Sequence, residues 1–229
     1  MRKFLISVAF VMFGVTSAQA SFVANGSFEL STVPNAPGRE ADMVHGATDI
    51  NNWVVYSTVA GPGFPVSLLE APFFGIVPSD GNRWLDLTGI VDAANGPFGG
   101  VRQSINLDVG NTYRVSFDIG ICNGFTCANG TNVGSAVSVL ARIGSTTLTA
   151  TNSDSREGNR WKTFEFYYTA TTATTLLSFE GSSNTATNKW YIGLDNVDVT
   201  LSPEPASFVL FGIGAAGLLA FARKRGSSR

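Results

Sequence analysis

The sequence predicts an all-β domain, an antiparallel two-sheet sandwich or jelly roll, set between two apolar chain ends. Three observations predict it. Apolar and polar residues alternate along many short runs, which is the period of a half-buried strand. Turn-forming pairs rich in Gly and Asn separate these runs. Helical periodicity is absent between the two ends, where Thr and Val, which favour strands, are abundant.

The runs YRVSFDI, AVSVLARI, KTFEFYYT and TLLSFEG carry this alternation most clearly. About ten short strands at this spacing are typical of a sandwich. Glu165 is expected to face outward. The residues expected to face inward are Tyr113, Val115, Phe117, Ile119, Val137, Val139, Ala141, Ile143, Phe164, Phe166, Tyr168, Thr175, Leu177 and Phe179.

The last run, WYIGLDNVDVTL, changes phase at Asp195-Asn196. Ile192 and Leu194 follow one alternation, and the apolar residues from Val197 onward follow the other. A β-bulge would return both sets to one face and would turn Asp195 toward a site. The alternative is that one set faces a second sheet.

The N-terminal end predicts a signal peptide over residues 1–20. Arg2 and Lys3 are basic, residues 4–15 are almost entirely apolar, and Ala18-Gln19-Ala20 has the small residues that signal peptidase accepts. The alternative is an uncleaved N-terminal anchor.

The C-terminal end predicts a short membrane helix. Residues 206–222 carry no charge, and 17 residues at about 1.5 Å each cover roughly 26 Å, near the lower limit for a bilayer. Basic residues begin the tail, residues 223–229, and by the positive-inside rule they remain cytoplasmic.

Pro203-Glu204-Pro205, the apolar helix and Arg223-Lys224-Arg225 stand in the order of a PEP-CTERM sorting signal, which residues 203–229 resemble. The resemblance implies a Gram-negative bacterium that makes exopolysaccharide, and an exosortase as a partner. The membrane anchor would be transient, with cleavage near the triplet and release to the cell surface or extracellular matrix. The alternative is a permanent single-pass anchor.

Residues 21–202 are expected to form one domain. They contain 9 basic and 16 acidic residues, a net charge near −7, with no basic stripe. This argues against nucleic acid and is compatible with neutral glycans and divalent cations. In an exported chain, Cys122 and Cys127 are expected to form a local disulfide. A metal pair is less well supported, because no further Cys or nearby His completes a site.

Five short motifs follow one another along the chain: NGSFE, PSDGNRWLDLTG, GGVRQSI, YRVSFDIG and GLDNVDV. This order resembles galactose-binding-like jelly rolls, especially the domain of unknown function of plant cell-wall proteins and its exported bacterial relatives. The resemblance implies a polysaccharide partner and a structural Ca²⁺ that joins the first strand to the last. The matching ligands are Ser27, through its carbonyl, Glu29 and Asp195. The alternative is that Glu29 and Asp195 are ordinary turn carboxylates. The plant proteins carry two such domains and more cysteines, so their pectin-like ligands do not transfer directly.

Sugar binding needs an exposed aromatic platform beside hydrogen-bonding side chains. The stretch from Trp53 to Trp84 is richest in both, although Trp53, Trp84 and Trp190 are expected in the core. The candidate ligand-binding residues are Tyr56, Phe73, Phe74, Asp80, Asn82 and Arg83.

No motif for a nucleophile, a catalytic metal or a phosphate loop is present, and the only histidine, His45, lies in an acidic, loop-like stretch. We therefore do not expect an enzyme. The leading hypothesis is an exported protein that binds polysaccharide without cleaving it. The alternatives are a structural or adhesion protein of the biofilm matrix without sugar specificity, and a polysaccharide hydrolase.

Overall fold

The computed structural model describes residues 20–57, 65–89, 98–124, 136–184 and 191–202. Within these ranges the chain forms eleven strands and no helix. The strands are β1 (Glu40–Met43), β2 (Val54–Ser57), β3 (Val66–Glu70), β4 (Arg83–Asp86), β5 (Gly99–Asn106), β6 (Thr112–Asn123), β7 (Val137–Ile143), β8 (Thr146–Asn152), β9 (Gly158–Thr169), β10 (Thr174–Asn184) and β11 (Gly193–Leu201).

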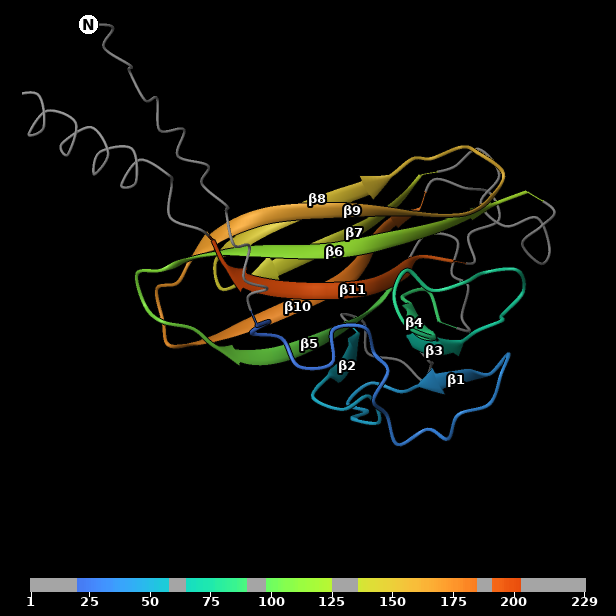
Figure 1. Cartoon of the computed structure of the whole chain (residues 1–229), viewed down its shortest axis with the longest axis horizontal. Coiled ribbons are helices and arrows are strands. Elements are labelled where there is room, and N and C mark those ends of the chain that lie inside the picture. The colour runs from blue at the N-terminus through green and yellow to red at the C-terminus, as the bar shows by residue number, and fades with distance from the viewer. Residues whose placement is uncertain (1–19, 58–64, 90–97, 125–135, 185–190, 203–229) are drawn as a thin grey trace, which may run out of the picture.

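The strands form two antiparallel sheets, as the sequence predicts. One has six strands in the order β1-β3-β4-β11-β6-β9, and the other has five in the order β2-β5-β10-β7-β8. Figure 1 shows the long strands of one sheet running beside those of the other. Because neighbours in each sheet are mostly far apart in sequence, the chain passes repeatedly between the two layers, as in a jelly roll.

The main core lies between the sheets and confirms the alternation read from the sequence. All expected inward residues of β6 and β7 are fully buried, as are Leu177 and Phe179 of β10. Tyr168 of β9 is buried and Glu165 is exposed. Trp53 also belongs to this core, where its ring packs against Phe28 and Phe179.

A second, smaller apolar cluster lies on the outer face of the six-stranded sheet. It contains Trp84, Tyr191 and Cys122, with Trp161 packed beside them. Trp84 is therefore buried as predicted, but outside the main core. Trp161 Nε1 donates a hydrogen bond of 2.8 Å to the carbonyl of Val77, so the segment between β3 and β4 closes over this cluster.

The phase change in the last strand is a β-bulge, which decides between the two readings. The register of β11 against β6 shifts between Asp195 and Asp198, and Asn196 adopts a φ of 50°. Leu194 and Val197 consequently both face the main core.

The N-terminal segment lies along the same strand. The amide of Phe22 donates a hydrogen bond to the carbonyl of Val199 (2.8 Å), and the amide of Val197 donates one to the carbonyl of Gly26 (3.0 Å). Backbone hydrogen bonds therefore already join the first part of the domain to the last.

Several predictions lie outside the described residues: the signal peptide up to residue 19, the sorting segment 203–229 with its helix 206–222, Trp190, and Cys127. Cys122 is buried at the end of β6, and its disulfide with Cys127 stays a prediction. In the part of the chain that the structure covers, no helix has the length and hydrophobicity to cross a membrane.

Candidate functional site

Two of the predicted calcium ligands contact the loop that precedes β4. The hydroxyl of Ser27 donates to Asp80 Oδ2 at 2.5 Å. Glu29 Oε1 accepts hydrogen bonds of 2.7 Å from the backbone amides of both Asn82 and Arg83. Glu29 thus holds the start of β4 against the N-terminal segment.

Asp195 contacts the same loop from the bulge in β11. Its Oδ2 accepts hydrogen bonds from the amides of Ser79 (2.7 Å) and Asp80 (2.9 Å), and its Oδ1 accepts one from the amide of Asn196 (2.7 Å). The side chain is fully buried, and burial raises the pKa of this carboxyl to about 7. The bulge therefore turns Asp195 toward the loop that precedes β4.

In this arrangement the carboxylates of Glu29 and Asp195 are both bound by backbone amides. Calcium needs six to eight oxygen ligands, whereas both carboxylates here face amide hydrogens. The described ranges also contain no group of three acidic, His or Cys side chains placed to hold a metal. The calcium ion stays a prediction, and a thermal shift on adding Ca²⁺ that EDTA reverses would be needed to support it.

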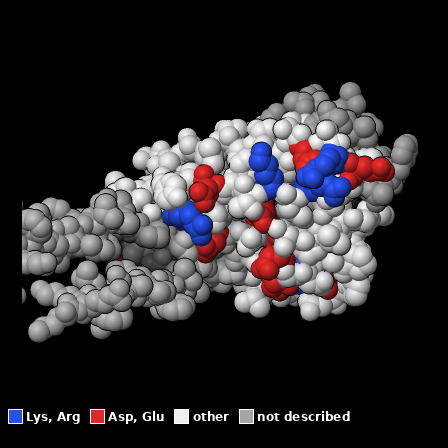
Figure 2. Space-filling model, turned by 45° about the horizontal axis from the view of Figure 1, so that its top comes forward, with Lys and Arg blue, Asp and Glu red and all other residues white. Residues whose placement is uncertain are grey.

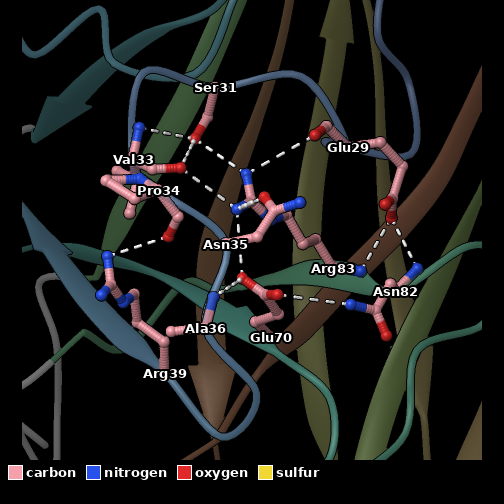
Figure 3. A network of polar contacts seen from close by, with 10 residues as sticks. All are labelled: Glu29, Ser31, Val33, Pro34, Asn35, Ala36, Arg39, Glu70, Asn82 and Arg83. Atoms are coloured by element: carbon pink, nitrogen blue, oxygen red, sulfur yellow. Dashed lines mark hydrogen bonds and ion pairs between the residues drawn. The ribbon is translucent and has the colours of Figure 1, made fainter.

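Arg83, a predicted ligand-binding residue, is instead a buried structural group (Figure 3). Only 2% of its surface is exposed. Its guanidinium pairs with Glu70 (3.1 Å) and donates to the Ser31 hydroxyl (2.9 Å), the Val33 carbonyl (3.1 Å) and the Asn35 side chain. With these partners it fastens the N-terminal segment to β3 and β4, so both of its Nη groups are already engaged within the fold. The sequence could not reveal this role, because it does not show that Glu70 lies opposite Arg83.

The other predicted residues near this loop are more accessible. Asp80 and Asn82 are exposed. Phe73 packs at the margin of the second apolar cluster, and its ring lies 4.6 Å from that of Phe74. Phe74 is 60% exposed and has a φ of 45°, a left-handed conformation that few aromatic residues adopt.

Tyr56 does not lie with these residues, because it belongs to the five-stranded sheet. It stands on β2, opposite Gly100 of β5, with its side chain half-buried. The six predicted ligand-binding residues therefore do not form one platform. Of these six residues, only Tyr56 lies on the outer face of the five-stranded sheet, which is the second candidate site.

A rung is a row of residues that are paired across neighbouring strands. Two rungs of that face bring together residues from all five strands. One rung runs from Tyr56 across Gly100 and Glu180 to Leu140 and Thr149. The next contains the following residues in order: Val54, Arg102, Ser178, Arg142 and Thr147. The alternation in each strand identifies these positions as outward-facing, but only the strand order places them side by side.

The Tyr56 ring is held by its neighbours. A Cβ atom at Gly100 would lie 2.8 Å from two ring carbons, so the ring rests directly on the glycine. The Arg102 guanidinium lies 5.7 Å from the ring centroid, a cation–π contact. The phenol oxygen lies 3.4 Å from Glu180 Oε2, which also pairs with Arg142 at 2.9 Å.

These contacts raise the pKa values of two side chains on this face, Tyr56 and Arg142. Burial, and then the charge of Glu180, raise the pKa of the Tyr56 phenol above its ordinary value. The hydrogen bond to Glu180 raises the pKa of Arg142. Tyr56 therefore stays a neutral hydrogen-bond donor, beside hydroxyl groups and two cations, over the whole physiological pH range.

On the face of the molecule that Figure 2 shows, basic and acidic side chains are mixed. In Figure 2, Lys and Arg side chains lie in small groups beside Asp and Glu, separated by uncharged residues. Arg114, for example, pairs with Glu165 (3.7 Å) and Asp198 (3.8 Å). This pattern agrees with the absence of a basic stripe in the sequence.

The comparisons with known proteins assign the domain. Residues 21–200 match the family described as protein of unknown function DUF642, and the chain belongs to this family. Residues 203–225 match the PEP-CTERM protein-sorting motif, which indicates exosortase-dependent export and sorting to the cell envelope. No curated protein matches the chain.

Solved structures with a similar fold include carbohydrate-binding modules and an adhesin domain. TmCBM61 in complex with β-1,4-galactotriose is 15% identical, with 80% of this chain and 99% of that one covered and a TM-score of 0.44. A family 35 carbohydrate-binding module from Clostridium thermocellum is 8% identical (72% and 99% covered, TM-score 0.41). The K1 cleaved adhesin domain of Lys-gingipain from Porphyromonas gingivalis W83 is 16% identical (72% and 100% covered, TM-score 0.46). At these TM-scores, no ligand is carried over from them.

Proposed function

We propose that the exported domain binds polysaccharide, without cleaving it, on the outer face of the five-stranded sheet around Tyr56. The observation that carries the proposal is the Tyr56 ring, fixed over Gly100 between Arg102 and Glu180. Aromatic rings pack against the C–H faces of sugars, and a few fixed polar groups beside the ring supply orientation.

The surroundings of Tyr56 suit a sugar polymer. The rungs beside it present the exposed hydroxyl groups of Thr147 and Thr149, while neighbouring Arg142 and Glu180 already neutralise each other. Because the face extends across five strands, it can contact several sugar units in a row. A hydrolase would need a pair of carboxyl groups at a suitable separation, and in these two rungs Glu180 is the single acid.

Affinity electrophoresis of the full chain in gels that contain the host exopolysaccharide tests this proposal. We expect Tyr56→Ala to weaken binding at least tenfold, the effect typical of losing a central aromatic contact. Tyr167→Ala is the matched control, because Tyr167 is 53% exposed on the other sheet. Equal losses in both variants, or none in either, would refute the proposed face. Self-association without saturable glycan binding would favour the structural or adhesion alternative.

We further propose that exosortase cleaves near Pro203-Glu204-Pro205 and releases the domain to the cell surface or matrix. The order of triplet, apolar segment and basic tail supports it. Intact-mass measurement of the surface or secreted protein should show that residues 206–229 are missing. Recovery of the intact carboxyl end would favour a permanent anchor.

A further inference from the structure

We propose that the polysaccharide bound on the five-stranded face is an acidic one that carries uronate carboxylates, and that Arg102 is the residue that selects it. This inference rests on the proposed function of the face. It adds the chemical class of the ligand and a specificity-determining residue that the sequence analysis did not identify.

Arg102 differs from Arg142, the other arginine on the outer face of the five-stranded sheet, because no ion pair joins it to an acid in the described residues. It is exposed on β5, and in the described part of the chain its guanidinium makes a contact with the Tyr56 ring but no hydrogen bond or ion pair. By contrast, Arg142 pairs with Glu180, and Arg114 pairs with two acids on the other sheet.

The charge of this face is therefore opposite to that of the domain. Residues 21–202 carry a net charge near −7. Among the outward-facing strand residues of the five-stranded sheet that the structure describes, Arg102 and Arg142 are opposed by Glu180 alone. One positive charge is left uncompensated, and it lies at the aromatic ring proposed to hold the sugar.

The chemistry of arginine favours a carboxylate as the missing partner. The guanidinium is planar and presents parallel N–H groups that match a carboxylate in a bidentate pair. A neutral sugar packed on Tyr56 would cover the same cation without giving it a partner, and covering an unpaired charge is costly. A uronate unit supplies both the apolar ring face for Tyr56 and the anion for Arg102.

The position of Arg102 within its rung supports recognition of a chain rather than of a free acid. Arg102 and Arg142 flank Ser178 in one rung, on strands two apart, so their Cα atoms are separated by about 10 Å. Arg142 is committed to Glu180, which leaves Arg102 as the anion contact beside Tyr56 and exposed threonine hydroxyls at the far side of the sheet. In a polymer with carboxylates at intervals, one sugar unit can pair with Arg102 while neighbouring units accept hydrogen bonds from the uncharged side chains.

The test compares alginate and hyaluronate with their carboxyl-reduced forms, which keep the linkages and lose the charge. Binding of the full chain to each polymer is measured by affinity electrophoresis and by calorimetry. We expect the acidic forms to bind at least tenfold more tightly than the reduced forms, and this preference to fall as NaCl is raised. Arg102→Gln should remove the preference. Arg114→Gln, the matched control on the other sheet, should change it less than twofold.

Four outcomes would each overturn one or both of the proposals. Equal binding of acidic and reduced forms that depends on Tyr56 but not on Arg102 overturns the acidic ligand and leaves the proposed function intact. Failure of the chain to bind either acidic polymer also overturns the inference, and loss of all glycan binding overturns both proposals. Equal binding of dextran sulfate through Arg102 indicates a general anion contact and overturns the choice of a carboxylate. Because Arg102 is exposed, an unchanged Tm in Arg102→Gln will show that the variant is folded.

Discussion

We expect the domain to become less stable as the pH rises from about 4 to about 8, because of the buried carboxyl group of Asp195. Burial raises the pKa of this group from the ordinary 3.8 to about 7. In the unfolded chain Asp195 ionises near its ordinary pKa, whereas in the fold it keeps its proton until about pH 7. The folded state therefore binds more protons than the unfolded state between these values, and stability falls with rising pH. The contribution is complete below the unfolded pKa and is lost as the pH passes through the folded one.

The size of the effect follows from the difference between the two pKa values. Each unit is worth 1.36 kcal/mol, so a difference of about three units corresponds to at most about 4 kcal/mol. For a domain of this size, that is a fall in Tm of roughly 8–16 °C. Asp118, the cross-strand neighbour of Asp195, and Asp80 in the contacting loop supply no positive charge that would reverse the sign.

Urea denaturation of the full chain at several pH values between 4 and 8 measures this dependence. Asp195→Asn cannot ionise, so its stability should change much less with pH than that of the parent. Asp198→Asn is the matched control, because Asp198 lies on the same strand but is partly exposed and pairs with Arg114. Identical pH profiles for the parent and Asp195→Asn would show that the three amide donors outweigh burial and keep the carboxylate ionised in the fold.

Three further substitutions test other parts of the fold by the same denaturation assay. Glu70→Gln leaves the buried cation of Arg83 without its ion partner, so we expect a loss of about 3–5 kcal/mol, partly recovered when Arg83→Met is added; no recovery would show that Glu70 acts independently. Phe74→Gly should stabilise the domain by about 1 kcal/mol, because it removes a left-handed non-glycine residue that is mostly exposed, and a loss instead would reveal a packing role. Gly26→Ala should cost about 1–3 kcal/mol, because a Cβ there collides with the carbonyl of Val197, and an unchanged midpoint would contradict this contact.

The core of the long strands could be predicted from sequence because a strand repeats every two residues. The inward sets of β6 and β7 follow from this period alone. The period also locates the phase change at Asp195, but it leaves open a bulge or a second sheet, and the register of β11 decides for the bulge. In each case the residues that decide the pattern lie within a few positions of one another.

The candidate site could not be predicted in the same way, because it depends on contacts between distant strands. Arg102 and Arg142 are separate outward positions in the sequence, and they flank Ser178 only because β10 lies between β5 and β7. Arg83 shows the opposite case. Its place in a stretch rich in aromatic and polar residues made it a candidate ligand-binding residue, but pairing of β3 with β4 places it against Glu70 and buries it.

The placement of the last strand has a mechanical consequence. While the sorting segment is held in the membrane, tension on the domain enters through the carboxyl end of β11. That strand is not at a sheet edge: it is paired with β6 over most of its length and with β4 at its start, and the N-terminal segment holds its far side through Phe22 and Gly26. Pulling β11 out would require breaking hydrogen bonds along both sides together, so a tethered domain should resist shear from flowing liquid without unravelling from its attachment point.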